Sequence, residues 1–445
     1  MHIVIAGVGA VGMYLAKMLV ENKHNVTIID KDKERIKIAE SQFDLISVHG
    51  SSSLISVLER ANVGKASLLI AVTSDHDVNF ITCILAKKLG AKTTIARIRD
   101  YEYLHPSEQK VYKSVGVDHM IYPERIAALE IAELMKLTAA TEVFAFSRGK
   151  LPLYSLKVAS DAPIVGKSLM EINNSHPGVD FRVVTIKRGE QSIIPFGNEK
   201  ILANDQVYIV SEKNTIHRIF DLTGNSYANI KDIMIVGGTK VGKRTAIELE
   251  GSFNVKLIEK DLGLCGELSD ILEKTLVINA DGHDLNVLED EGIENTDAFI
   301  SVTNSTEANI FLCLLAKRYG VKKTIALVDD LELIEVSQKI GVDTIVNKKL
   351  IAASYIFRFV MDVQIVSAKS LVGVEIDAFE FVVTKDSRIA HKKIRDIGFP
   401  KGAIIGGFAR KKKVYIAVGD SLIQPDDHVV VFCHPKIVKE VQNLF

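Results

Sequence analysis

The sequence contains an internal duplication, which restricts the chain to folds assembled from two similar halves. The segment IVIAG at 3–7 recurs as IMIVG at 233–237, an offset of 230 residues. With the same offset, residues 69–97 and 299–327 are identical at about 13 of 29 positions. The sequence therefore predicts a repeated unit of a little over 200 residues, present twice in the 445-residue chain.

Each unit divides into two parts with different patterns. The first parts, 1–135 and 229–360, alternate apolar runs such as LLIAV at 68–72 with amphipathic helical patterns. Such runs are typical of strands covered on both faces of a parallel sheet. The second parts, 141–225 and 365–445, contain short strands and turns. We therefore predict an α/β fold with two Rossmann-like, doubly wound parallel-sheet domains, each followed by a small β-rich α+β domain.

A glycine-rich turn joins the first predicted strand to the first predicted helix. It has the pattern GxGxxG and consists of Gly7, Val8, Gly9, Ala10, Val11 and Gly12. In this setting the first glycine forms the tight turn, the second lets the backbone approach a pyrophosphate, and the third packs the helix against the strand. The N–H groups at the start of the helix are then available to phosphates.

The second predicted strand ends at Asp30, 18 residues after Gly12. A carboxylate at this point accepts hydrogen bonds from ribose hydroxyls and repels a 2′-phosphate, which favours NAD(H) over NADP(H). The alternative is a glycine turn that only packs tightly, with Asp30 as a solvated strand end. The turn, its position between strand and helix, and the acid together favour a dinucleotide site.

The second copy of this turn has diverged. It reads Gly237, Gly238, Thr239, Lys240, Val241 and Gly242, and Glu259 takes the place of Asp30. A β-branched side chain at the position of Gly9 hinders the close approach of a dinucleotide, whereas Lys240 is able to meet a phosphate directly. We expect the second site to bind nucleotide more weakly than the first, or to prefer another ligand.

Further polar residues follow later strands, at the edge where ligands bind in open α/β sheets. In the first copy they are Ser51, Ser52, Thr73, Ser74 and Arg97. Arg97 is suited to contact a phosphate or to stack on adenine. The alternatives are ordinary turn chemistry for the serines and a surface ion pair for Arg97. The second copy keeps a threonine at 303 but has Leu327 in place of Arg97.

The chain lacks the signatures of catalysis. A dehydrogenase needs a substrate domain that holds an acid or base against the nicotinamide, yet no histidine of the small β-rich parts recurs between the copies. No HExxH, GxSxG or GxxxxGK[ST] motif is present. Cys83 and Cys313 are repeat-equivalent on apolar helix faces and are expected to be buried. We predict no catalytic residues, no metal site, and a protein that senses a dinucleotide without transforming it.

Composition argues against several other classes. There are 55 Lys and Arg against 56 Asp and Glu, so neither nucleic acid nor an anionic membrane is expected as the main partner. The four cysteines form no CxxC pair, and no apolar stretch is long enough for a membrane span. The N-terminus does not read as a signal peptide, so we expect a cytoplasmic protein. The basic run 410–413 is expected to be a solvated hairpin turn.

Together these features resemble the TrkA family. The resemblance is carried by the GxGxxG turn with Asp30, the motif VTSDHDVN at 72–79, the TIAR that ends at Arg97, and the small β-rich part, all duplicated in tandem. It covers nearly the whole chain. Members of this family are cytosolic regulatory subunits of bacterial and archaeal Trk potassium-uptake systems. Their α/β units are called RCK or KTN domains, and their small modules TrkA-C domains.

The resemblance implies partners and ligands. It implies a homotetrameric ring of RCK domains that docks, at the inner face of the cell membrane, on an ion-conducting subunit of the TrkH or TrkG type. NAD(H), and in some members ATP or ADP, gates that subunit. The implied nucleotide contacts are Gly7 through Val11, Asp30, Ser51, Ser52, Thr73, Ser74 and Arg97, and in the second copy Gly237 through Val241, Glu259 and Asp281.

The expected function is therefore a non-enzymatic, nucleotide-sensing subunit that gates potassium uptake. Two alternatives stay open. The first is an NAD-dependent oxidoreductase, against which the missing catalytic group argues. The second is the gating ring of a potassium efflux channel or antiporter, against which a tandem chain without a fused pore argues.

Overall fold

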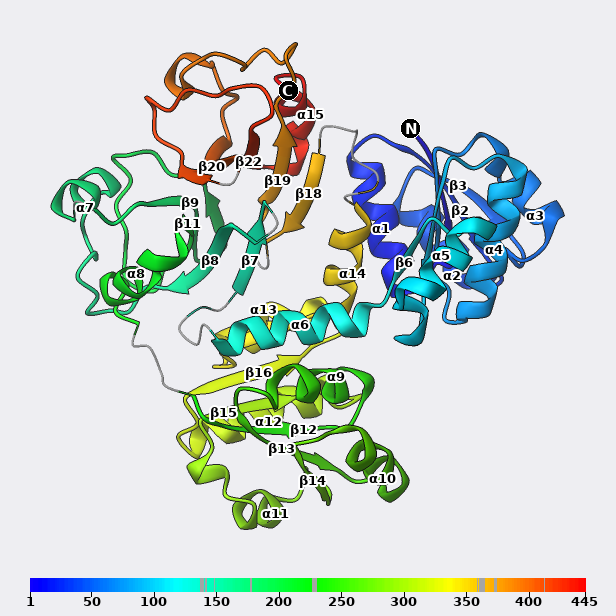
Figure 1. The fold of residues 1–445 in the computed structure, drawn as a ribbon, viewed down its shortest axis with the longest axis horizontal. Helices are drawn as coiled ribbons and strands as arrows, with labels where there is room; N and C mark the ends of the chain where they lie inside the picture. Colours follow the sequence, from blue (N-terminus) through cyan, green and yellow to red (C-terminus); the bar gives the residue numbers. More distant parts are fainter. Residues whose placement is uncertain are drawn as a thin grey trace. The chain divides into compact units, whose positions relative to one another are not determined.

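The computed structural model describes residues 1–136, 140, 142–147, 149–176, 178–225, 230–357, 359, 365–371, 374–411 and 413–445 (Figure 1). The chain divides into two compact units. Unit 1 comprises Met1–Ile126 and Lys348–Met361, and unit 2 comprises Ala127–Asn347 and Asp362–Phe445. In the described part of the chain, no helix combines the length and apolar character that crossing a bilayer requires.

Unit 1 is built on a six-stranded parallel sheet with the order β3-β2-β1-β4-β5-β6. Because the order reverses between β1 and β4, the carboxyl ends of these two strands form the point where ligands bind in open α/β sheets. The strands are β1 (His2–Ala6), β2 (Asn25–Asp30), β3 (Ile46–His49), β4 (Leu68–Ala71), β5 (Thr93–Arg97) and β6 (His119–Ile121). The helices are α1 (Ala10–Glu21), α2 (Lys33–Gln42), α3 (Ile55–Arg60), α4 (His76–Leu89), α5 (Pro106–Val115) and α6 (Pro123–Lys136), with single-turn helices at Val63–Lys65 and Glu102–Leu104.

The core of unit 1 follows from its apolar strands. Strand β4 is buried along its whole length, and β1 is buried from Ile3 to Ala6. A core cluster on one face of the sheet packs these strands against α3 and α4, whose buried residues include Val57, Leu58 and Cys83. Asp32 and Asp75 cap the starts of α2 and α4 with their side chains, which satisfies backbone N–H groups that would otherwise lack acceptors. The strand ends that carry the predicted site are therefore held on a rigid base.

The second parallel sheet, in unit 2, repeats the first. Its order is β14-β13-β12-β15-β16-β17, with every pair of neighbours parallel. The strands are β12 (Asp232–Val236), β13 (Asn254–Glu259), β14 (Leu276–Asn279), β15 (Ala298–Ser301), β16 (Lys323–Leu327) and β17 (Thr344–Val346). The helices are α9 (Lys240–Leu249), α10 (Leu262–Ile271), α11 (Leu285–Asp290), α12 (Thr306–Arg318), α13 (Glu332–Lys339) and α14 (Lys348–Phe357), with a single turn at Ile293–Asn295. The two parallel sheets confirm the predicted Rossmann-like duplication.

Two helices do not belong to the compact unit that contains the strand before them. Helix α14 follows β17 of the second sheet along the chain, yet it belongs to unit 1, where it packs against α1. Helix α6 follows β6 of the first sheet, yet from Ala127 onward it belongs to unit 2. The repeat boundaries at 135 and 360 thus do not coincide with the compact units, and the four-domain division stays a prediction.

Two small antiparallel sheets complete unit 2, and we call them the first and second β modules. Their strand orders are β10-β9-β11-β8-β7 and β18-β19-β22-β20-β21. The first module contains β7 (Glu142–Phe146), β8 (Leu151–Lys157), α7 (Leu169–Ser175), β9 (Phe181–Arg188), β10 (Gln191–Ile193), β11 (Gln206–Ser211) and α8 (Ile216–Leu222), with a single turn at Lys213–Thr215. The second contains β18 (Ile365–Ser370), β19 (Asp377–Val382), β20 (Ala403–Arg410), β21 (Lys413–Ile416), β22 (His428–Cys433) and α15 (Val438–Gln442), with single turns at Ile394–Asp396 and Pro435–Ile437.

The two β modules share one apolar core. Side chains of the first module, including Phe146 and Leu151, pack with Ile376, Val430 and Phe432 of the second. A repeated ion pair stabilises each module. Arg188 binds Asp205, and at equivalent positions Arg410 binds Asp427, which is fully buried.

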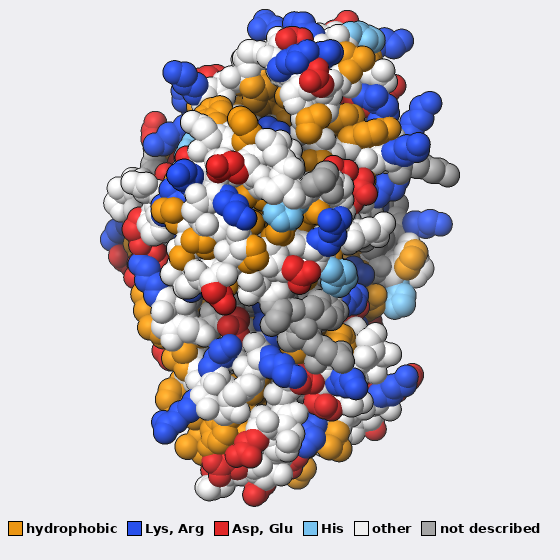
Figure 2. Space-filling model, turned by 90° about the vertical axis from the view of Figure 1, so that its left-hand side faces the viewer, with side chains coloured by type: hydrophobic (Ala, Val, Ile, Leu, Met, Phe, Trp, Pro, Cys, Tyr) orange, Lys and Arg blue, Asp and Glu red, His pale blue; other side chains and the backbone are white. Residues whose placement is uncertain are grey.

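The basic run at 410–413 therefore differs from the solvated turn that the sequence predicts. Its first residue is a structural cation, because Arg410 donates both Nε and Nη2 to the buried carboxylate of Asp427. Lys411 does lie in a turn, with φ +55°, and Lys412 lies outside the described residues. On the face drawn in Figure 2, acidic and basic side chains are interspersed, as the near-zero net charge leads us to expect.

Candidate functional site

The first glycine turn connects β1 to α1 and is shaped by contacts that leave no room for a side chain. Gly7 has φ +100°, and a Cβ there would lie 2.7 Å from the backbone N of Thr73. A Cβ on Gly12 would lie 1.9 Å from the carbonyl O of Gly7. Both positions require glycine, because only glycine lets the turn close and the helix approach the strand.

Gly9 differs from these two glycines, because it faces open space. Its φ is −72°, and the nearest atom to a Cβ there would be Nη1 of Arg35, at 3.9 Å. Gly9 is the N-cap of α1, and no side chain of the described residues caps this helix. The N–H groups of its first turn are therefore available to an anion, with a guanidinium beside them.

Asp30 connects this turn to the end of β2. Its Oδ2 accepts a hydrogen bond from the N–H of Val8 at 2.6 Å, and its Oδ1 accepts one from the N–H of Asp32 at 2.9 Å. Asp30 is only 8% exposed. Each carboxylate oxygen has a further lone pair, which a ribose hydroxyl can use. The carboxylate thus holds the turn in place as well as offering an acceptor to a ligand, and the sequence predicts only the second role.

A buried asparagine holds the loop that follows β4. Oδ1 of Asn79 accepts hydrogen bonds from the backbone N–H and the Oγ1 of Thr73, at 2.9 and 2.7 Å. Nδ2 of Asn79 donates to the carbonyl O of Arg97 at 2.9 Å. Asn79 therefore joins the ends of β4 and β5 and brings Thr73 and Arg97 to the same sheet edge as the glycine turn.

Arg97 makes the ion pair that the sequence analysis considers as one alternative. Its Nη2 lies 3.5 Å from Oε1 of Glu124 on α6. Nε of Arg97 and Oε2 of Glu124 are both buried, and neither has a hydrogen-bond partner among the described residues. The pair is thus incompletely satisfied, and the guanidinium belongs to a side chain that is 28% exposed and has N–H groups able to donate to a phosphate oxygen.

The three predicted serines lie in different environments. Ser52 is buried, and its Oγ shares a hydrogen bond of 2.8 Å with Oγ1 of Thr82 on α4, so its hydroxyl is used inside the fold. Ser51 is partly exposed and its Oγ pairs with that of Ser53 at 2.8 Å. Ser74 is exposed. Ser51 and Ser74 are thus more accessible to a ligand than Ser52.

The second glycine turn, between β12 and α9, keeps the structural glycines and changes the residue at the open position. Gly237 has φ +107°, and a Cβ on Gly242 would lie 1.9 Å from the carbonyl O of Gly237. Thr239 stands where the first turn has Gly9. Its Oγ1 donates to the carbonyl O of Val302 at 2.7 Å and accepts from the N–H of Gly242 at 3.3 Å. Helix α9 is therefore capped by its own threonine, which occupies an N–H that a phosphate would use.

The acid of the second site is held as in the first. Oε2 of Glu259 accepts from the N–H of Gly238 at 2.6 Å, and Oε1 accepts from the N–H of Asp261 at 2.9 Å. Asp281 stands at the position of Ser51 and is 57% exposed. The backbone N–H and the ring of His283 bond its carboxylate and lower the pKa of Asp281. Lys240 begins α9.

The second site lacks the two arginines of the first. Leu264 and Leu327 stand at the positions of Arg35 and Arg97. The loop scaffold is nevertheless the same, because Asn309 accepts from the N–H of Thr303 at 2.9 Å and donates to the carbonyl O of Leu327 at 2.8 Å. The two sites thus share a framework and differ in the groups that would meet a ligand.

Two residues of the first site are absent from the sequence-based assignment. Arg35 lies in the first turn of α2, shortly after Asp30, and the difference between Arg35 and Leu264 in the two copies is the signal that could have identified it. Asn79 is identical in both copies, as Asn309, and lies in the motif VTSDHDVN. Among the described residues, no cluster of three or more His, Cys, Asp or Glu side chains is arranged to hold a metal ion.

Comparison with known families agrees with this architecture. The TrkA-N domain model matches residues 3–123 and 233–348, and the TrkA-C domain model matches 153–224 and 378–445. The Trk system potassium uptake protein TrkA of Vibrio alginolyticus is 34% identical over 452 residues, covering 100% of this chain and 98% of the relative. The protein of the same name from Halomonas elongata is 32% identical over 450 residues with the same coverage. TrkA homolog 1 of Methanosarcina mazei is 32% identical over 454 residues, with all of both chains covered.

Solved structures support the fold. The GsuK RCK domain superposes with a TM-score of 0.61 at 18% identity, covering 100% of this chain and 94% of that one. The GsuK channel bound to NAD gives a TM-score of 0.61 at 17% identity and covers 100% of this chain and 78% of the channel. At these identities the likeness concerns the arrangement of the elements alone.

Proposed function

The chain belongs to the TrkA family, and from this premise we propose that it is a regulatory subunit of a potassium-uptake transporter that responds to NAD(H). The family assignment is supported over the full length of the chain by relatives named Trk system potassium uptake protein TrkA. The nucleotide response is supported by the site itself, where the open start of α1 lies beside Asp30, Arg35 and Arg97.

The uncapped start of α1 is the single observation that carries this proposal. A pyrophosphate placed over Gly9 would accept from the N–H groups of the first helical turn, and the guanidinium of Arg35 would lie close to it. The ribose would meet the carboxylate of Asp30, where a 2′-phosphate would be repelled. Ser51 follows β3, and Thr73 and Ser74 follow β4, so these residues would line the same edge of the sheet as the bound nucleotide. ATP or ADP fits the same donors through its own phosphates and ribose.

Arg97 supplies a route from the ligand to the rest of the chain. A phosphate that pairs with the guanidinium of Arg97 would compete with Glu124, which lies in the first turn of α6. Helix α6 begins in unit 1 and continues into unit 2. We infer that nucleotide binding alters the position of α6 and thereby the gating of the transporter.

We propose that the second site, at Thr239, Glu259 and Asp281, binds nucleotide more weakly than the first or binds another ligand. Its helix start is already capped by Thr239, and leucines replace both arginines. Cations are gained along α9 instead, where Lys240, Lys243 and Arg244 stand at the positions of Ala10, Met13 and Tyr14. A ligand other than NAD(H), or weaker binding of NAD(H), suits a helix start that is already capped and a site from which both arginines are missing.

A ring of four chains is supported by a repeated apolar surface. Each copy exposes three large apolar side chains on neighbouring helices, α4 with α5 and α12 with α13. They are Ile81, Val111 and Val115 in the first copy and Phe311, Val336 and Ile340 at equivalent positions in the second, all between 41% and 60% exposed. Apolar surface kept at the same place in both copies suits an interface in which the two repeats meet those of neighbouring chains.

Two measurements test the proposal. In the first, NADH is titrated into the purified chain by calorimetry, and its absorbance is then followed over hours in the presence of candidate metabolites; binding without turnover is expected. In the second, potassium flux is measured in vesicles that hold a TrkH-type transporter with the chain added, with and without NADH. A change of inward flux on adding NADH is expected. Steady NADH consumption would support the oxidoreductase instead, and control of outward flux alone would support an efflux channel or antiporter.

A further inference from the structure

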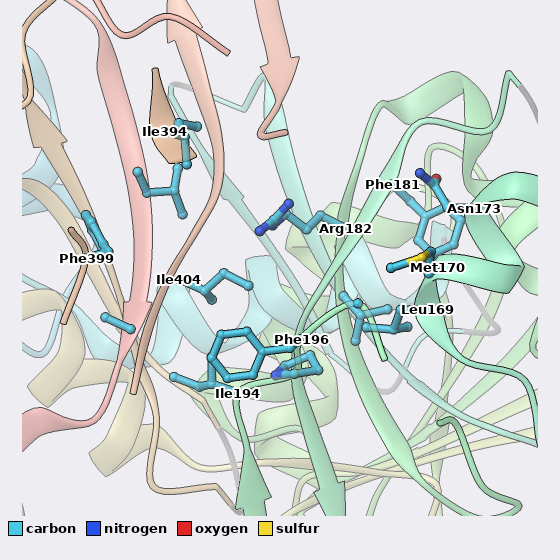
Figure 3. Close-up of a pocket in the computed structure, with 15 residues that line it drawn as sticks. Leu169, Met170, Asn173, Phe181, Arg182, Ile194, Phe196, Ile394, Phe399 and Ile404 are labelled. Carbon is cyan, nitrogen blue, oxygen red and sulfur yellow. The ribbon is translucent and has the colours of Figure 1, made fainter. Parts of the chain in front are cut away.

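A pocket of about 400 Å³ lies between the first and second β modules, within unit 2 (Figure 3). The first module contributes residues of α7, β9 and the segment after β10, among them Leu169, Arg182 and Phe196. The second contributes Ile394, Phe399 and Ile404, among others. Pockets of about 300–1,000 Å³ are the size that holds small-molecule ligands. This pocket is far along the chain from both glycine turns and is not used by the proposed function.

Arg182 is the one cationic side chain among the described residues that line this pocket. Arg182 reaches from β9 toward the second module, as Figure 3 shows, and its Nη1 donates to the carbonyl O of Ala417 at 2.7 Å. Its Nε is buried and has no hydrogen-bond partner among the described residues. Burial also lowers the pKa of Arg182, which is the mark of a cation that has lost its water without gaining an anion. The fifteen described residues that line the pocket include no carboxylate.

The rest of the lining is almost entirely apolar. Apart from Arg182, only Asn173 carries a polar side chain, and the others include three phenylalanines, Phe181, Phe196 and Phe399. Phe196 is 72% exposed although it is a large apolar residue, so its ring is available to cover a ligand. An arginine without an acidic partner in such surroundings suits a single negative charge carried on an apolar body.

The duplication shows that this cation is a local addition. Arg188 and Asp205 of the first module correspond to Arg410 and Asp427 of the second, an offset of 222 residues. With the same offset, Arg182 corresponds to Ile404, and both side chains line this pocket. The two modules are related in sequence, yet they present an arginine on one side of the pocket and an isoleucine on the other. One side therefore suits an anion and the other an apolar group.

We propose that this pocket binds a small organic monoanion, a carboxylate with an apolar body, whose carboxylate pairs with Arg182 and whose body lies against Ile404 and the phenylalanines. The carboxylate would accept from the guanidinium of Arg182, which has no carboxylate partner among the described residues of the lining. Because residues of both β modules would contact the ligand, its binding stabilises their association. The proposal is independent of nucleotide binding at the glycine turns.

The test compares two probes of nearly the same shape that differ in charge. Calorimetry and thermal unfolding of the full chain are performed with 2-naphthoate and with 2-naphthamide. We expect naphthoate to bind and to raise the unfolding temperature, and the amide to bind about tenfold or more weakly, because the charge-assisted hydrogen bond is lost. Equal affinity for the two probes, or binding of neither, would overturn the proposal.

Three variants connect the binding to this pocket. Arg182→Met keeps the length of the side chain, removes the charge, and should abolish the preference for naphthoate. Ile404→Trp keeps the charge, fills the pocket, and should abolish binding of naphthoate; this variant retains the test if Arg182→Met fails to fold. Arg218→Met is the matched control, because Arg218 also donates one Nη1 to a carbonyl, that of Gly178 at 3.2 Å, but does not line the pocket. Unchanged naphthoate binding in both pocket variants would show that the probe binds elsewhere and would sink the proposal.

Discussion

The two glycine turns of this chain have the same backbone and offer a ligand different surfaces. In both, the outer glycines are required by contacts that a Cβ would turn into clashes, and an acid accepts from an N–H of the turn at 2.6 Å. At the open position, however, one turn has Gly9 and an uncapped helix, whereas the other has Thr239, whose hydroxyl caps the helix. After duplication, the residues that build the fold were thus retained while the residues that meet a ligand changed.

The largest effect is expected where the two turns agree. Gly12→Ala and Gly242→Ala each place a Cβ at 1.9 Å from a carbonyl O, which the backbone must move to relieve. We expect each substitution to lower the free energy of unfolding by about 3 kcal/mol or more, by overpacking and backbone strain. Thermal or urea unfolding measures this loss. A small loss in one variant and a large one in the other would contradict a shared backbone requirement.

The next largest effect is expected where the turns differ. Gly9→Thr transplants the capping residue of the second turn into the first, where φ −72° and the open surroundings accept a side chain. We expect unchanged stability and a loss of NADH affinity of about a hundredfold, because the threonine both covers the helix start and takes an N–H. Calorimetry with NADH measures the loss.

Gly9→Ala serves as its matched control. It adds a Cβ without a hydroxyl and should weaken NADH binding less than Gly9→Thr. If the two variants bind NADH equally, the hydroxyl cap is not the difference between the turns, and the proposed reason for the divergence of the second site fails.

The two acids offer a sharper comparison. Asp30→Ala should weaken NADH binding by about 1.5–3 kcal/mol, the value of a charge-assisted hydrogen bond to ribose. Glu259→Ala, the same change at the second site, should leave tight NADH binding at the first site intact. Thermal unfolding followed by circular dichroism checks that Asp30→Ala, which loses the hydrogen bond from the N–H of Val8, is still folded. Equal effects of the two substitutions would mean that the sites share the ligand.

The smallest effect is expected for the arginine that pairs with α6. Arg97→Leu copies the second site, and we expect NADH affinity to fall by about 1 kcal/mol, since the guanidinium contributes one partly screened phosphate contact. The same variant should uncouple flux from NADH in the vesicle assay, because the competition with Glu124 is lost. Full NADH-dependent gating by Arg97→Leu would show that the signal does not pass through this ion pair.

The sequence predicts the architecture well because duplication and apolar strand runs are strong signals. Both parallel sheets, both antiparallel modules and the buried Cys83 and Cys313 are confirmed. What it does not predict depends on contacts between residues far apart in the chain. The bond of Ser52 to Thr82, the proximity of Arg35 to Gly9 and the buried pairing of Arg410 each join separate elements, which a linear pattern does not record.

The sequence does not predict the placement of α6 and α14, for the same reason. Nothing in the local pattern of α6 or α14 distinguishes a helix that covers its own sheet from one that belongs to the other unit. The site residues themselves stay predictions that the binding measurements will decide.

The place of α14 in unit 1 also has a consequence for the synthesis of the chain. Helix α14 is made after both parallel sheets, yet unit 1 needs it to cover α1. A ribosome therefore releases a complete first nucleotide-binding unit only when most of the polypeptide has been synthesised. A gene fragment that ends at the first repeat boundary would encode unit 1 without α14.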